Sequence, residues 1–137
     1  MIVSGRLDMP HFMVDYSANL ETEIDFGALC NHLRIAGIST GVFAKKGIRV
    51  RALRADHWSI ADGSPRHGYV HLVVRLRGDR DLETRKRATK AVFTAMTEFL
   101  ADVIETRSIA VSMEMVDIDP ELSPKLNMIP KYMDQEA

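Results

Sequence analysis

One order of hydrophobic patterns, strand then helix then strand, occurs twice in this chain of 137 residues, and it restricts the fold more than any other feature. Apolar residues alternate with polar ones in a strand and recur every three or four positions in a helix. Two strands joined through a helix lie parallel, because the connection crosses over the sheet, normally with a right-handed sense. The repeat predicts an α+β fold, a two-layer sandwich in which a four-stranded mixed sheet has both helices on one face.

The first half predicts a strand over residues 11–16, which alternate between apolar and polar positions. Asp25 is expected to cap a helix with apolar residues at the three-and-four spacing, and Gly37 is expected to end it. A second strand is predicted over residues 47–52, and its pattern allows a continuation through residues 58–61. These elements form the first strand-helix-strand unit.

The second half begins with a strand over residues 70–76, which stops at Gly78. Asp81 then caps the longest helix, and the apolar stripe of this helix extends to Val103. A fourth strand is predicted over residues 109–115. The tail that follows contains several prolines and is expected to have little regular structure.

The two halves also share a short sequence similarity, since a related tetrapeptide precedes the helix at residues 19–22 and at residues 81–84. With both helices on one face, the other face of the sheet lacks a cover. Met113 and Met115, or whichever set of alternating residues does not face the helices, are expected to lie exposed on that face in a single chain, and a large apolar sheet face usually marks an interface. The pattern therefore predicts an oligomer.

Composition and charge argue against several classes of partner. The formal net charge is −1, with acidic and basic residues interspersed, so nothing in the electrostatics favours nucleic acid or an anionic membrane. No apolar run approaches the ~20 residues that span a bilayer, and residues 1–8 lack the long apolar region of a secretory signal. We therefore expect a cytoplasmic protein. Its single cysteine, Cys30, falls in a helical apolar pattern and is expected to be a buried small hydrophobe.

Pro10 directly follows Met9 and opens the first strand. If translation starts at Met9 and this methionine is removed, Pro10 becomes an amino-terminal secondary amine, which is a base near neutral pH. If the chain starts at Met1, the same nitrogen is an amide and has no basic lone pair. Taken alone, Pro10 is most simply a proline at the start of a strand, where the missing N–H is tolerated.

Several stretches, in the same order and with nearly the same spacing, resemble the 5-carboxymethyl-2-hydroxymuconate isomerase family of the tautomerase superfamily. They are Pro10-His11-Phe12, Thr40-Gly41, Gly47-Ile48-Arg49 with Arg51-Ala52, Ala61-Asp62-Gly63, Val70-His71, Gly78 to Arg80 with Leu82-Glu83 and Arg85, and Leu122 to Asn127. The resemblance implies a homotrimer with its sheets inward, its helices outward and its active sites between subunits. It also implies that neither a metal nor an organic cofactor is needed.

The resemblance assigns the catalytic role to Pro10, as the general base, and a substrate-binding role to Arg49 and Arg80. The forked donors of arginine suit a carboxylate and a developing oxyanion. Arg80 also lies at the mouth of the helix that Asp81 starts, where the helix amino terminus favours an anion. For Arg51 we expect a solvated or interface role instead.

The function implied is a cofactor-independent isomerase of a carboxylated hydroxymuconate from aromatic-acid catabolism. Two alternatives stay open: another reaction of the superfamily on an unsaturated oxo acid, or a non-catalytic small-acid-binding trimer with Pro10 blocked. Residues 1–9 depart from the family pattern and are expected to be an extension, from a misassigned start, to a single domain over residues 10–137. If they are retained, residues 2–7 are expected to add an edge strand or to plug the pocket.

The remaining polar residues predict no further site. The five histidines, at positions 11, 32, 57, 67 and 71, show no metal-ligand spacing with cysteine or carboxylate partners. His71 is expected to be a hydrogen-bonded core residue. The basic run at residues 85–87, with Lys90, is expected to be a solvated helix face, because no aromatic residues are interleaved for RNA or DNA binding.

Overall fold

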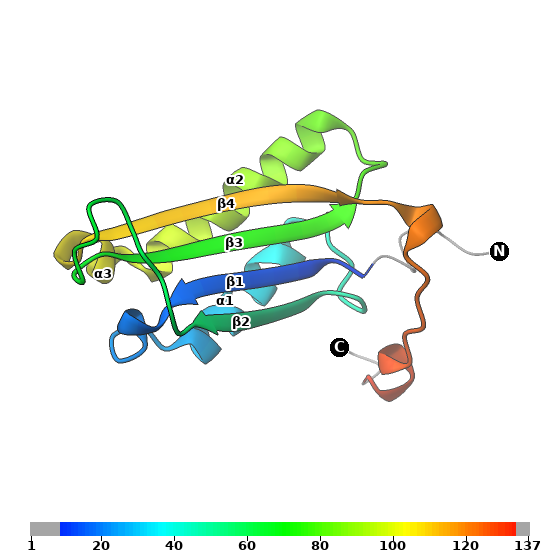
Figure 1. Cartoon of the computed structure of the whole chain (residues 1–137). Helices are drawn as coiled ribbons and strands as arrows, with labels where there is room; N and C mark the ends of the chain where they lie inside the picture. Colours follow the sequence, from blue (N-terminus) through cyan, green and yellow to red (C-terminus); the bar gives the residue numbers. More distant parts are fainter. Residues whose placement is uncertain (1–8, 134–137) are drawn as a thin grey trace.

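The computed structural model describes residues 9–133, which form one mixed sheet covered on one face by two long helices (Figure 1). The predicted two-layer α+β architecture is therefore confirmed. The elements in chain order are β1 (His11–Ser17), the 3-10 turn η2 (Ala18–Leu20), α1 (Phe26–Ser39), β2 (Arg49–Ala55), β3 (Gly68–Arg77), α2 (Leu82–Phe99), α3 (Ala101–Thr106), β4 (Ile109–Ile118), and the 3-10 turns η3 (Pro120–Leu122) and η4 (Ile129–Tyr132).

The strand order β2-β1-β3-β4 is the one that two adjacent strand-helix-strand units produce. β1 pairs parallel with β2, and β3 pairs parallel with β4, while β1 and β3 are antiparallel. At one end of the sheet, His11 on β1 pairs with Arg49 on β2 and with Arg75 on β3. The topology thereby places one histidine and two arginines side by side on three adjacent strands.

The hydrophobic core lies between the sheet and the helices, where the inward faces of β1 and β3 meet the apolar stripes of α1 and α2. Removing this surface from water is the main contribution to folding. The largest fully buried side chains are Phe12, Leu20, Leu29, Leu33, Leu72, Leu76, Met96, Leu100, Val14, Val70, Val74 and Val92.

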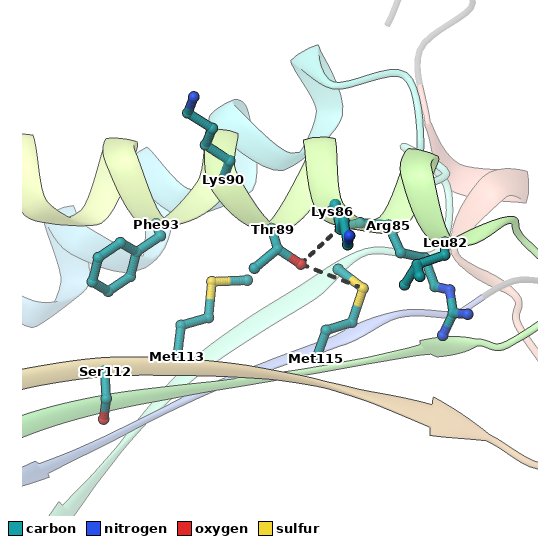
Figure 2. Close-up of a pocket in the computed structure, with 9 residues that line it drawn as sticks. All are labelled: Leu82, Arg85, Lys86, Thr89, Lys90, Phe93, Ser112, Met113 and Met115. Atoms are coloured by element: carbon teal, nitrogen blue, oxygen red, sulfur yellow. Dashed lines mark hydrogen bonds between the residues drawn. The ribbon is translucent and has the colours of Figure 1, made fainter.

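The two methionines of β4 were named first for the open face of the sheet, and this placement is wrong, because the other set of alternating residues lies there. Met113 and Met115 pack against the core and point from β4 toward α2, whereas Ser112 points to the other side (Figure 2). The open face is instead largely polar, and on it the Tyr69 hydroxyl donates to Asp15 at 2.7 Å. Apolar and polar residues do alternate along β4, as predicted. Which of the two alternating sets faces the helices was decided by the register of β4 with β3.

His71 also lies on the open face and not in the core, which corrects a second expectation. Its side chain is half-buried, and Nδ1 lies 2.7 Å from the Ser112 hydroxyl on the neighbouring strand. The buried residues of β3 are its neighbours Val70 and Leu72, because successive strand residues point to opposite faces.

Helix α1 does not end at Gly37, as the sequence suggested, but continues to Ser39 with Thr40 as its cap. Gly37 serves packing instead, since a Cβ there would lie 2.9 Å from the Ile48 side chain. Just after the helix, Gly41 has a left-handed backbone, at a φ of 76°. The start of the helix is as predicted, because Asp25 accepts a hydrogen bond from the Ala28 N–H at 3.0 Å.

Two further boundaries differ from the predicted ones. β2 ends at Ala55, opposite Ser17, because its partner β1 ends there, and residues 58–61 are not in a strand. The second long helix ends at Phe99, and Leu100 separates it from the short helix α3 with a non-helical ψ of 8°. Val103 therefore belongs to α3.

The tail after β4 crosses the end of the sheet at which β1 and β2 begin, as Figure 1 shows in orange and red. As predicted, it has little regular structure, apart from the turns η3 and η4. Within the described residues no helix is both long and apolar enough to cross a membrane. The expectation that residues 2–7 form an edge strand or a plug lies outside the described residues.

Candidate active site

Pro10 lies directly before β1, at the end of the sheet that the tail crosses. Pro10 is buried, and its carbonyl oxygen accepts a hydrogen bond from the Arg49 N–H at 3.1 Å. A proline suits the first position of a strand because it has no N–H to pair there. Met9 is buried beside it, with 9% of its surface exposed.

Arg49 begins β2 and directs its guanidinium at the start of β1. Its Nη2 donates to the Met9 carbonyl oxygen at 3.1 Å and lies 2.6 Å from His11 Nε2. Its Nε is buried and has no hydrogen-bond partner among the described residues. A buried donor without a partner is costly, so this atom favours a bound acceptor.

His11 is neutral in this environment. A guanidinium nitrogen can only donate, so His11 Nε2 accepts from Arg49 and the ring proton lies on Nδ1. Burial lowers the pKa of His11 below its ordinary value of 6.5, and four nearby cations lower it further. These cations are Arg49, Arg51, Arg75 and Lys125.

Two cavities lie beside Met9, and both are lined by Met9, Arg49 and Leu126. The first, of about 310 Å³, is cationic: its walls include Arg75 and Lys125, together with the neutral His11. The second, of about 550 Å³, is mainly apolar and is lined by the tail residues 126–129 and 132–133. No Asp or Glu lines either cavity within the described part of the chain.

The tail holds its place through hydrogen bonds that the sequence did not predict. The Asn127 side-chain amide donates to the Lys46 carbonyl oxygen at 2.8 Å, in the loop before β2. The Lys125 ammonium donates to the Ser123 carbonyl oxygen at 3.0 Å and lies 3.3 Å from its hydroxyl. Sequence reasoning therefore missed Lys125 as a site residue. It also missed His11 and Arg75, although the antiparallel pairing of β1 with β3 is a signal that could have indicated Arg75.

Arg80 lies in the loop between β3 and α2, at the same end of the sheet as Pro10. Its Nη2 donates to the Val42 carbonyl oxygen at 2.9 Å, and its Nη1 lies 3.6 Å from Asp79. Asp81 caps α2 as predicted, accepting from the Thr84 N–H at 2.7 Å. Arg80 lines neither cavity beside Met9, so the single chain brings Arg49 and Pro10 together but leaves Arg80 outside that pair.

A third cavity, of about 500 Å³, lies between α2 and β4 (Figure 2). Its floor is formed by Met113 and Met115, and the Thr89 hydroxyl donates to the Arg85 carbonyl oxygen and lies 3.8 Å from the Met115 sulfur. It is lined by none of the residues that the sequence predicted for the site, and its charged lining residues are Arg85, Lys86 and Lys90.

Within the described residues no group of three or more His, Cys, Asp or Glu side chains is placed to hold a metal ion. His67 contacts Ser108 and Asp62, each at 2.7 Å. Cys30 is only half-buried, so the expectation of a buried cysteine is only partly met, and burial raises the pKa of its thiol.

The pH dependence of stability should report the environment of His11. The folded pKa lies below 6.5, so the unfolded state binds more protons as the pH falls. The stabilisation is therefore complete above about pH 6.5 and is lost as the pH falls through the folded pKa. The unfolding free energy of the wild type, minus that of His11→Gln, should decrease between about pH 7.5 and pH 5.5 in urea titrations. His32→Gln, at an exposed position on α1, is the control, and parallel curves for wild type and His11→Gln would contradict the assignment.

The comparisons with known proteins agree on one family. The family model described as 5-carboxymethyl-2-hydroxymuconate isomerase matches residues 10–133. The 5-carboxymethyl-2-hydroxymuconate Delta-isomerase of Escherichia coli is 33% identical over 121 residues, which cover 88% of this chain and 96% of that protein. A crystal structure of a 5-carboxymethyl-2-hydroxymuconate delta-isomerase has a TM-score of 0.87, at 26% identity over 94% of this chain and 95% of that one. The isomerase from Deinococcus radiodurans R1 has a TM-score of 0.85, at 27% identity over 93% of this chain and 97% of that one.

Proposed function

The chain belongs to the 5-carboxymethyl-2-hydroxymuconate isomerase family, and we propose that it converts 5-carboxymethyl-2-hydroxymuconate to the 2-oxo-3-ene isomer in aromatic-acid catabolism. In this reaction the hydroxyl on C2 loses a proton and C5 gains one, while two conjugated C=C bonds become a ketone and one C=C bond. No electron is lost or gained overall. The observation that carries the proposal is the acid-free, cation-lined cavity to which Met9 and His11, the two neighbours of Pro10, contribute. Apart from Met9, its lining lies within the region that matches the family.

Pro10 is proposed as the group that moves the proton, in the form of the chain in which its nitrogen is a free amine. A general base works best with a pKa near the working pH. Burial and neighbouring cations disfavour a charged amine, as they do for the adjacent His11, and so favour the neutral base. Met9 is bonded to the Pro10 nitrogen and lines both cavities, so its removal would open both of them toward that nitrogen.

Arg49 and Arg80 are proposed as the arginines that bind the substrate. For Arg49 the support is geometric, because its buried Nε lacks a partner and its guanidinium lies at the start of β1. A carboxylate or an enolate oxygen would supply the missing acceptor. For Arg80 the support is its place in the family pattern and at the start of α2, where an anion is favoured.

We propose that the protein assembles as a homotrimer and that the open face of the sheet and the tail form its interfaces. The tail carries large apolar side chains that a single chain leaves in water: Leu122 is 80% exposed and Leu126 is 84% exposed. Exposed apolar groups gathered on one segment usually mark a contact. Active sites between subunits would then use residues from two chains.

The double variant Leu122→Ser, Leu126→Ser should weaken this assembly. Burying a leucine contributes about 1.5–3 kcal/mol, so the two changes should raise the dissociation constant by about a hundredfold or more. Sedimentation equilibrium of the wild type should give three times the mass of one chain, and the variant should shift toward single chains. Ile35→Ser, at an exposed position of α1, is the control. A wild type that is a monomer at all concentrations would contradict the proposal.

The proposed partner is a small carboxylated molecule, with neither nucleic acid nor a membrane involved. A cytoplasmic location is proposed because a polyanionic acid crosses a bilayer poorly, so its enzyme works in the compartment that contains the acid. Residues 10–137 are proposed as one domain, with residues 1–9 as an extension.

The test of the reaction is proton NMR of 5-carboxymethyl-2-hydroxymuconate in D₂O with the chain that begins at Pro10. The product should carry one deuterium at C5, and the rate should exceed that in buffer. A rate equal to that in buffer would reject this substrate. A panel of other unsaturated 2-hydroxy acids would then test for another reaction of the superfamily.

A further inference from the structure

We propose that His11, Arg75 and Lys125 form a second carboxylate subsite, which gives the site its preference for acids with more than one carboxylate. The inference rests on the proposed function only for the identity of the acid, because the cavity itself belongs to the described structure. The subsite is distinct from the roles given to Arg49 and Arg80.

The three residues come from separate parts of the fold and meet at one cavity of about 310 Å³. His11 and Arg75 are paired across β1 and β3, so their side chains share the open face of the sheet. Lys125 comes from the tail, which is fixed to the loop before β2 by the hydrogen bond from Asn127 to Lys46. Both Arg75 and Lys125 are close enough to His11 to lower its pKa.

The charges and donors of this cavity are not neutralised within the described chain. Its lining contains no Asp or Glu, and the Arg75 guanidinium makes no hydrogen bond or ion pair with the other described residues. Lys125 donates only to Ser123, although an ammonium has three N–H groups. His11 Nδ1 carries the ring proton, because Nε2 accepts from Arg49. Gathering like charges without acids is unfavourable unless an anion binds between them.

A carboxylate fits these groups better than a neutral ligand does. Its two oxygens can accept from the Arg75 guanidinium and from the Lys125 ammonium, and such charge-assisted hydrogen bonds are about twice as strong as neutral ones. The proposed substrate has three carboxylates, two from muconate and one from the carboxymethyl group. Arg49 and Arg80 are assigned to the reacting part of the substrate. The subsite would therefore hold a substrate carboxylate that lies farther from the reacting carbon atoms.

Calorimetric titration of the full chain with trans,trans-muconate and with sorbate tests this subsite. The two acids have the same six-carbon diene, but sorbate has one carboxylate and muconate has two. Neither has the hydroxyl group needed for the reaction. Muconate should bind at least about tenfold more tightly, which is the effect expected of one charge-assisted hydrogen bond. Equal affinities for the two acids, or no binding of muconate, would overturn the proposal.

Variants distinguish the effect of the subsite charges on muconate binding from the effect of the protein's net charge. Lys125→Met should weaken muconate binding about tenfold and leave sorbate binding unchanged, and Lys125→Arg should restore muconate binding. Arg75→Gln should act in the same direction. Arg66→Gln, an equal loss of charge at an exposed turn far from the cavity, should change neither affinity. Muconate binding that is unaffected by both Lys125→Met and Arg75→Gln would reject the subsite.

NMR titration of His11, assigned with His11→Gln, gives a readout independent of activity. A carboxylate bound by Arg75 and Lys125 would offset the cations that lower the pKa of His11, so muconate should raise this pKa in the wild type but not in Lys125→Met. A pKa that muconate leaves unchanged would count against the subsite. Because all these measurements use binding by the full chain, failure of the isomerase assay would reject the proposed reaction and leave the subsite standing.

Discussion

A chain that begins at Pro10 should isomerise 5-carboxymethyl-2-hydroxymuconate at least about a hundredfold, and up to about ten-thousandfold, faster than the chain that begins at Met1, the range expected of a general base. The change converts an amide nitrogen, which has no basic lone pair, into a secondary amine. The measurement is the initial rate of substrate loss by NMR, with intact mass confirming the first residue of each protein.

The two proteins should be equally stable, because the core that contains Phe12, Leu72 and Leu100 is the same in both. Matching thermal midpoints would show that the activity difference is chemical and not a folding defect. A third protein, in which Pro10 is the first residue but is replaced by alanine, keeps a primary amine and should retain part of the activity. Equal rates for the Met1 and Pro10 proteins would show that Pro10 is not the base.

In the chain that begins at Pro10, Arg49→Ala and Arg80→Ala should each lower kcat/KM by about 10²–10³, the effect of removing one donor to a developing oxyanion. Arg51→Ala is the matched control, because Arg51 is an exposed arginine two residues from Arg49 and has no assigned contact with substrate. Steady-state kinetics with the hydroxymuconate give the comparison, expressed as a loss of transition-state stabilisation.

The outcome for Arg80 is the sharper one, because the single chain places it outside both cavities beside Met9. A large loss of kcat/KM in Arg80→Ala would mean that assembly of the subunits brings Arg80 into an active site. A loss no greater than that of Arg51→Ala would remove Arg80 from the mechanism and leave Arg49 as the substrate arginine.

The sequence was sufficient to predict the helices and strands, because helix caps and alternating patterns depend on residues that are close together in the chain. Asp25 and Asp81 cap helices in the structure as their side-chain chemistry predicts, and the alternation over residues 70–76 is the core of β3. Boundaries that depend on a partner were wrong. The end of β2 was set by the end of β1, and Gly37 stayed inside α1 because its missing side chain lets the helix lie close to Ile48.

The candidate site could be predicted only in part. Pro10 and Arg49 were indicated by the family pattern, and the pairing of β1 with β2 brings them together. Lys125 was not indicated, because it reaches the site through a tail with no periodic pattern. Met113 and Met115 were named first for the open face, with the other alternating set as the alternative, since an alternating pattern gives two faces without saying which one meets the helices.

By itself, then, the sequence determined the order of the elements, the parallel pairing within each half and the single layer of helices. Periodicity and the handedness of crossover connections depend only on neighbouring residues. The tertiary structure alone decided which face of β4 is buried and that His11, Arg75 and Lys125 line one cavity. Those features join residues that lie far apart along the chain, and their positions follow from how the sheet, the helices and the tail pack together.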